Sequence, residues 1–154
     1  MTSHLFEKAG LAVAFILAGS LSLANDPAVK VKVEGAWARA TVQGQKGTGA
    51  FMNITAKEGT RLVGVSSPAA GVAEVHEMKM EGDIMKMRAM PSLDLPAGKA
   101  VALKPGGHHV MLMDLKQALT VGSKVPLTLT FKDAKGVESK LDLSLPVSSV
   151  APKP

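Results

Sequence analysis

Short alternations of apolar and polar residues, separated by glycine, proline and charged turns, constrain the fold of this chain most. From Val29 onward they recur at intervals typical of a β-sandwich or barrel, and helical periodicity is nearly absent. We therefore predict an all-β fold in a single domain. The expected strands are 29–34, 50–55, 61–66, 73–80, 84–89, 100–103, 109–115, 125–131 and 141–145.

Turn-forming residues divide these strands. Glu81, Gly82 and Asp83 lie between two alternating runs and predict a tight hairpin. Segment 104–107, Lys-Pro-Gly-Gly, breaks the chain just before the histidines at 108 and 109. Segment 90–99 contains two prolines and a glycine, so we expect a loop there.

The first 24 residues resemble an export signal, with a short polar start that ends at Lys8 and an uncharged stretch over 9–23. The alternative is a membrane anchor, but 15 uncharged residues with two glycines fall short of the roughly 20 apolar residues of a spanning helix. We predict cleavage before Asn25 and no stable membrane insertion afterwards. The predicted organisation is a signal peptide over 1–24, a β-sandwich domain over 25–147 and a flexible tail over 148–154, where prolines recur.

The composition excludes several classes of function. The chain has no cysteine, which rules out disulfides, thiolate metal sites, cysteine nucleophiles and blue-copper centres within this sequence. Its net charge of +5 comes from 18 basic and 13 acidic residues spread along the chain, and only 3% of residues are aromatic. Nucleic-acid binding is therefore not expected. We expect a monomer, because charged, turn-rich strands need not expose a large apolar patch.

Histidine and methionine provide the candidate metal ligands. Ten residues separate His76 from Met87, 21 separate Met87 from His109, and one separates His109 from Met111. Residues i and i+2 of a strand share a face, so His109 and Met111 project together. Imidazole and thioether donors suit Cu(I) better than zinc, calcium or magnesium.

Core packing is the competing interpretation, because methionine commonly fills gaps in protein interiors. We assign Met52, Met90 and Met113 to packing or chance. Seven of the nine methionines and three of the four histidines fall between positions 76 and 113. This clustering by itself leaves a soft-metal site and core packing equally weighted.

Further residues near the cluster have open roles. His108 would point to the face opposite His109, so we expect it to support the site from outside the ligand set or to lie at the surface. Met78, Met80 and Met85 are candidate auxiliary thioethers for a departing or second copper ion.

At these positions the chain resembles the PCuAC family of periplasmic copper chaperones, whose motif is His-x10-Met-x21-His-x-Met. His76, Met87, His109 and Met111 satisfy that motif. The similarity continues through 36–39 (Ala-Trp-Ala-Arg), 61–63 (Arg-Leu-Val), 76–78 (His-Glu-Met), 85–88 (Met-Lys-Met-Arg), 95–98 (Leu-Pro-Ala-Gly), 103–107 (Leu-Lys-Pro-Gly-Gly) and 109–113 (His-Val-Met-Leu-Met).

The resemblance implies a cupredoxin-like Greek-key β-sandwich in the bacterial periplasm that binds one Cu(I) per chain. It also implies copper delivery toward the dinuclear copper centre of cytochrome c oxidase, through an oxidase subunit or another copper chaperone. His108 stands where relatives commonly have an aromatic residue, and the C-terminal end lacks the His- and Met-rich extension of some members.

Three classes of function follow. The first is a copper carrier without turnover, which delivers copper or sequesters it for tolerance. The second is a copper oxidase or oxygenase, against which the thioethers argue because they favour the reduced ion. The third is a metal-free sandwich used in adhesion or assembly, in which the methionines line the core.

Overall fold

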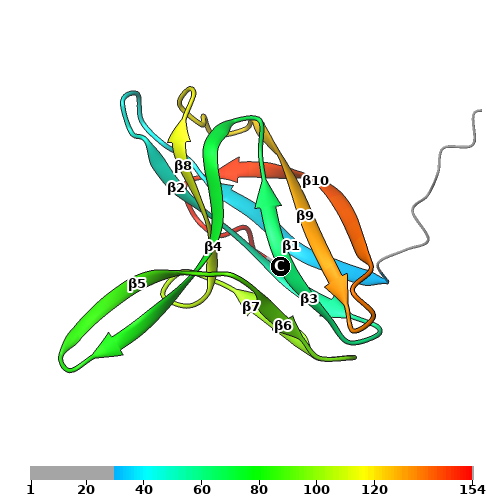
Figure 1. The fold of residues 1–154 in the computed structure, drawn as a ribbon. Coiled ribbons are helices and arrows are strands. Elements are labelled where there is room, and N and C mark those ends of the chain that lie inside the picture. The colour runs from blue at the N-terminus through cyan, green and yellow to red at the C-terminus, as the bar shows by residue number, and fades with distance from the viewer. Residues whose placement is uncertain (1–29, 154) are drawn as a thin grey trace, which may run out of the picture.

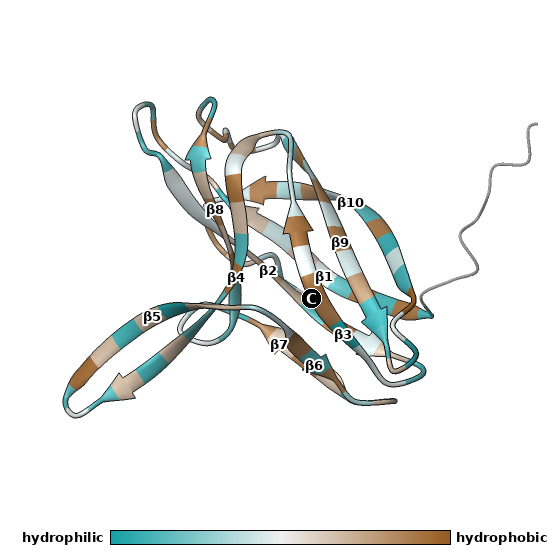
Figure 2. Cartoon of the chain, viewed as in Figure 1, coloured by the Kyte–Doolittle hydropathy of each residue, from teal (hydrophilic) through white to brown (hydrophobic). Residues whose placement is uncertain are grey.

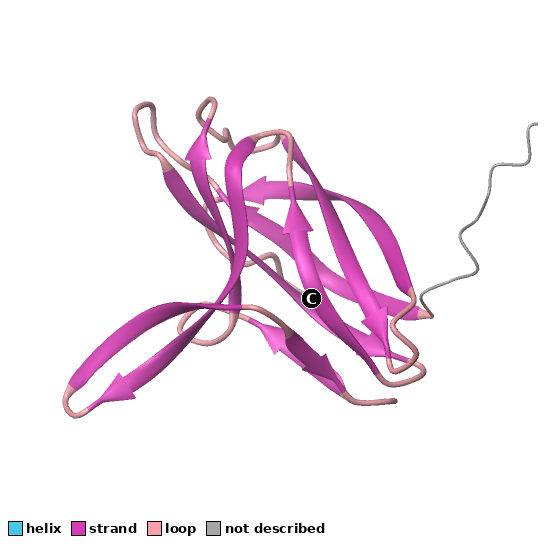
Figure 3. Cartoon of the chain, viewed as in Figure 1, coloured by secondary structure: helices cyan, strands magenta, loops and turns pink. Residues whose placement is uncertain are grey.

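Strands make up all of the regular secondary structure in residues 30–153, the part of the chain that this computed structural model describes (Figure 1, Figure 3). They are β1 (Val31–Arg39), β2 (Gly47–Ala56), β3 (Thr60–Ser66), β4 (Ala70–Glu81), β5 (Ile84–Met90), β6 (Leu93–Leu95), β7 (Ala100–Leu103), β8 (His109–Leu115), β9 (Lys124–Asp133) and β10 (Glu138–Ser148). Residues 30–153 include no helix long and apolar enough to cross a membrane. The predicted signal segment, 1–24, lies outside the described residues.

The strands form two packed layers. Along the sheet their order is β5-β4-β8-β2-β1-β10-β9-β3-β6, and β7 pairs with β2. The layers meet where β1 runs parallel to β10, with Ala38 opposite Val147 and Arg39 opposite Ser148. The other strand pairings are antiparallel. The predicted all-β sandwich is confirmed.

Alternate residues of the strands form the core between the layers. In β9 every second side chain from Val125 to Phe131 is buried, while the residues between them are half-buried or exposed. The inner side of β2 contributes Ala50, Met52 and Ile54. Burying one large aliphatic side chain stabilises a fold by about 1.5–3 kcal/mol. Met52 is fully inside this core, as predicted.

Two segments differ from the sequence predictions. The expected loop over 90–99 contains β6, which pairs with β3 and buries Leu93 and Leu95. The flanking prolines led us to predict a loop where the structure has a strand of three residues. The last strand, predicted over 141–145, extends over Glu138–Ser148; near its end Val147 is buried and its N–H donates to the carbonyl of Ser123 at 2.9 Å.

One hairpin leaves the sandwich. β4 pairs with β8 only as far as His76, which lies opposite His109, whereas its pairing with β5 continues to Glu81. Residues 77–88, which we call the arm, project away from the two layers as a two-stranded ribbon (Figure 1). Gly82 turns the chain at the tip with φ +63°, and the predicted hairpin is confirmed. Apolar and polar bands alternate along both strands of the arm (Figure 2).

Candidate metal site

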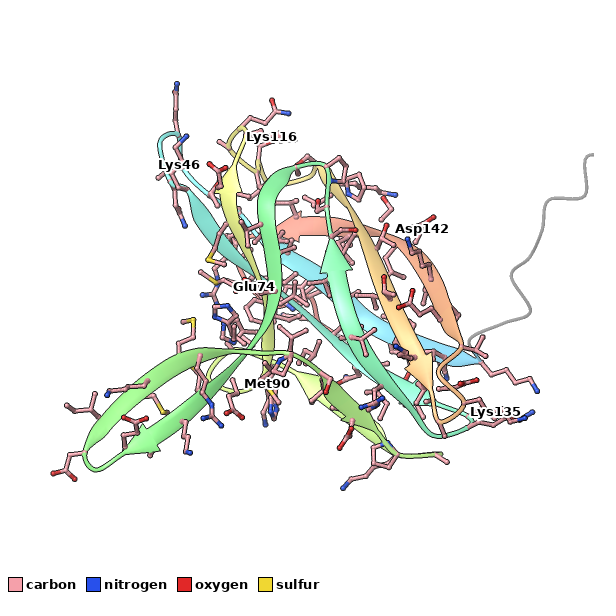
Figure 4. All side chains as sticks on the ribbon, viewed as in Figure 1. Lys46, Glu74, Met90, Lys116, Lys135 and Asp142 are labelled. Carbon is pink, nitrogen blue, oxygen red and sulfur yellow. The ribbon has the colours of Figure 1, made fainter. Side chains whose placement is uncertain are left out.

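The two candidate histidines lie where the arm meets the sandwich. His76 of β4 and His109 of β8 are directly opposite each other in the antiparallel register. Their ring centroids are 5.9 Å apart, and the residues are only 9% and 6% exposed. Figure 4 labels Glu74 on β4 and Met90 at the end of β5, which mark this junction. Strand pairing thus brings together two imidazoles that are 33 positions apart in the sequence.

One nitrogen of each imidazole is already engaged. Nδ1 of His109 donates to the carbonyl oxygen of Gly107 at 2.9 Å. Nε2 of His76 donates to the Glu74 carboxylate at 2.9 Å. A carbonyl or carboxylate oxygen accepts hydrogen bonds, so each contact fixes the tautomer of its ring. The other nitrogen of each ring keeps its lone pair, as metal-binding histidines require.

The free nitrogen of His76 is unusual for its surroundings. Within residues 30–153, Nδ1 of His76 is the one buried side-chain nitrogen or oxygen that lacks a hydrogen-bond partner. Leaving a buried polar atom unsatisfied costs about 1–3 kcal/mol, so such atoms need an explanation. A bound cation would supply the missing partner.

Both candidate thioethers border the same hollow. Met111 follows His109 by two residues on β8, and Met87 stands opposite Met78 in the β4–β5 hairpin. A cavity of about 340 Å³ is lined by Met78, Met87, His109 and Met111, together with residues of β1, β2 and the turn before β8. Met87 is 47% exposed on the arm, whereas Met111 is half-buried in the sandwich.

An aromatic pair backs the site. The rings of Trp37 and Phe51 lie 4.9 Å apart, and the ring of Phe51 is 6.4 Å from that of His109. The Arg39 guanidinium covers the pair at 5.3 Å from the Phe51 centroid. Neither aromatic ring belongs to the main core cluster. The site therefore lies on the outer face of its layer, where it packs against this aromatic pair and not against the core between the layers.

Two glycines of β2 make room for this arrangement. A Cβ at position 49 would lie 2.7 Å from the Phe51 ring. A Cβ at position 47 would lie 3.4 Å from the terminal methyl of Met111. Glycine at these positions lets the ring and the thioether lie close against the strand.

The remaining candidate residues lie elsewhere. Met80 and Met85 face each other further out on the arm. His108 points away from His109, since its Nε2 lies 3.8 Å from the carboxylate of Glu77 at the base of the arm. Among the described residues, no group of three or more His, Cys, Asp or Glu side chains could hold a metal ion.

Sequence reasoning missed several residues of this site. Glu74 could have been found, because it precedes His76 by two residues on the same strand face. Phe51, Arg39 and Gly49 come from β1 and β2, and no local spacing connects them with the histidines.

Comparisons with known proteins identify the family of this chain. The family model described as "Putative lipoprotein LpqE-like" matches residues 31–143. A relative from Leifsonia xyli, "Putative lipoprotein Lxx21020", is 38% identical over 106 residues, which are 67% of this chain and 63% of the relative. The chain thus spans less than two thirds of that relative's length.

Solved structures of PCuAC domains are also similar. The copper-bound PCuAC domain from PmoF2 aligns with a TM-score of 0.57 and 27% identity, over 77% of this chain and 94% of that domain. Apo-DR1885 from Deinococcus radiodurans aligns with a TM-score of 0.59 and 31% identity, over 97% of this chain and 95% of that protein. The Cu(I) form of DR1885 aligns with a TM-score of 0.57 and 28% identity, over 86% and 83%. The predicted PCuAC resemblance and cupredoxin-like sandwich are confirmed, and the chain belongs to the LpqE-like family.

Proposed function

We propose that this protein is a Cu(I) carrier that holds one ion per chain with His76, Met87, His109 and Met111. One observation carries the proposal: the buried imidazoles lie in register, 5.9 Å apart, each keeps one nitrogen free, and His109 lines the same cavity as the thioethers of Met87 and Met111. Two neutral imidazole nitrogens and two thioether sulfurs form a soft, uncharged ligand set. Such a set favours Cu(I) over Zn²⁺, Ca²⁺ and Mg²⁺.

Transfer proceeds by ligand exchange. Met87 is the most exposed of the four side chains and belongs to the arm, whereas His76 and His109 are fixed by hydrogen bonds. An acceptor's donor atom therefore displaces the Met87 sulfur first, and the imidazoles release the ion last. The ion remains Cu(I) throughout, so no electron donor or acceptor is needed.

We further propose that the chain is exported to the bacterial periplasm by its segment 1–24 and works there as a monomer. Its acceptor would be the dinuclear copper centre of cytochrome c oxidase, reached through an oxidase subunit or another copper chaperone. The motif and the similarity to PCuAC domains support this choice. Sequestration for copper tolerance uses the same ligands and differs only in the absence of an acceptor.

The competing classes have weaker support. A copper oxidase or oxygenase needs a centre that cycles between oxidation states, while thioethers stabilise the reduced ion. A metal-free adhesion or assembly module leaves the buried Nδ1 of His76 without a partner. We therefore propose a protein without catalytic turnover.

A competitive Cu(I) titration tests the ligand assignment. The protein is titrated against a chromophoric chelator under anaerobic reducing conditions, beside Met111→Leu, the double variant His109→Ala, Met111→Leu, and the core control Met52→Leu. We expect tight binding of one equivalent in the native protein and the control, a weaker affinity in Met111→Leu, and loss of tight binding in the double variant. Full affinity in Met111→Leu would contradict the assignment.

A transfer assay separates delivery from sequestration. The Cu(I)-loaded protein is mixed with the copper-free soluble domain of the oxidase subunit that contains the dinuclear centre, and the two are separated and assayed for copper. Copper on the acceptor supports delivery. Retention on this chain, under conditions in which the chelator does remove the ion, supports sequestration.

A further inference from the structure

The arm presents its methionines as two facing pairs. Met78 stands opposite Met87, and Met80 stands opposite Met85. Residues i and i+2 of a strand share a face, so all four thioethers lie on one side of the ribbon. The next position inward on that side is His76, opposite Ala89. Soft donors therefore follow one another from the tip of the arm to the candidate site.

The other side of the arm is charged. Arg88 pairs with Glu77 across the strands, and Nζ of Lys86 lies 2.7 Å from the carboxylate of Glu81. The methionine side thus presents sulfur to solvent without a charge of either sign.

Packing does not account for the outer pair. Met80 is 56% exposed and Met85 is 50% exposed. Neither belongs to the core cluster or to the hydrophobic residues packed against it in the described part of the chain. These two apolar side chains on the arm are therefore exposed to solvent, and core packing does not explain their presence.

The register places the sulfurs within reach of one ion. Directly opposite residues of an antiparallel pair have Cβ atoms about 4.5–5.5 Å apart, and a flexible methionine side chain can turn its sulfur toward its neighbour. Successive pairs on one face are about 6.8 Å apart, from the rise per residue of an antiparallel strand. A third thioether, from Met78, is thus next to the outer pair.

We propose that Met80 and Met85, supplemented by Met78, form a second site for a soft monovalent cation, Cu(I) or Ag(I). The site contains thioethers only and is open to solvent, so it binds more weakly than the imidazole-containing site. Its existence does not require the proposed function, because the donors differ; passage of its ion inward to His76 does rest on that function.

Silver titration followed by NMR tests the second site. Ag(I) is a redox-stable probe of the same charge as Cu(I), and the protein carries ¹³C-labelled methionine methyl groups. We expect two equivalents in the native protein, the second of which shifts the methyl signals of Met80 and Met85. In Met80→Leu, Met85→Leu the second equivalent should disappear and the first should keep its affinity. The arm control Ile84→Leu, whose residue is 63% exposed, should bind both.

A further variant separates failure of this site from failure of the carrier function. In His109→Ala, Met111→Leu the weak equivalent at Met80 and Met85 should remain. A native protein that binds one equivalent, without movement of these two methyl signals, overturns the second site and leaves the carrier proposal intact. Methyl shifts at Met80 and Met85 that require a protein partner rather than Ag(I) would instead identify a docking surface and also overturn it.

Discussion

The strands of the sandwich and of the arm both alternate apolar and polar residues, but they differ in strand pairing and in burial. In the sandwich, strands such as β9 have partners on both sides and bury every second residue. In the arm, β4 and β5 pair only with each other beyond His76, and every residue of β5 except Met90 is exposed. The candidate ligands straddle this boundary, with three on the sandwich side and Met87 on the arm. For the proposed carrier, we infer that the sandwich is the fixed half that selects the ion and that the arm is the adjustable half that admits and releases it.

The largest expected effect is a difference in stability between the two regions. Phe131→Ala removes a fully buried ring and should lower the free energy of unfolding by about 3–5 kcal/mol. Ile84→Ala, on the exposed arm, should change it by no more than about 0.5 kcal/mol. Urea denaturation measures both values. Similar losses in the two variants would mean that the arm is packed as part of the sandwich in solution.

The next effect concerns two carboxylates, one on each side of the boundary. Glu74→Gln removes the charged acceptor that orients His76, and loss of such a partner lowers metal affinity by about 10- to 100-fold. Glu81→Gln alters an exposed ion pair of the arm and should leave Cu(I) affinity unchanged. The Cu(I) titration described above measures both. Equal affinities in the two variants would remove Glu74 from the site.

The smallest effect is expected from one added methyl group. Gly49→Ala places a Cβ against the Phe51 ring and should cost about 1 kcal/mol, the low end for overpacking, because the ring can shift. It should also move the indole N–H resonance of Trp37. Gly64→Ala is the control, since its Cβ would be 3.6 Å from the nearest atom, on Thr130, an ordinary contact distance. An unchanged indole resonance in Gly49→Ala would show that the ring does not depend on this glycine.

Much of the fold could be predicted because period-two alternation and turn residues are local features. The hairpin at Gly82 and the strand through His109 follow from such patterns. β6 was missed because three residues between prolines are too short to display a period. The end of β10 was missed because its order comes from pairing with β1, a partner about a hundred positions away.

The site could be predicted only in part, for a related reason. Spacing and residue type selected His76, Met87, His109 and Met111, and alternation predicted which of them share a strand face. Alternation does not determine which strands become neighbours, so the register of His76 with His109 required the structure. The same holds for Phe51 and Arg39, whose role arises from tertiary packing alone.

The aromatic support behind His109 has an optical consequence. The chain contains one tryptophan and no tyrosine, so its long-wavelength ultraviolet fluorescence comes from Trp37 alone. That indole contacts Phe51, which in turn lies 6.4 Å from the imidazole of His109. The protein therefore has an intrinsic fluorophore at the back of its candidate ion site. We expect the emission intensity of Trp37 to change when that site is occupied, so that transfer can be followed in real time in the unlabelled native chain.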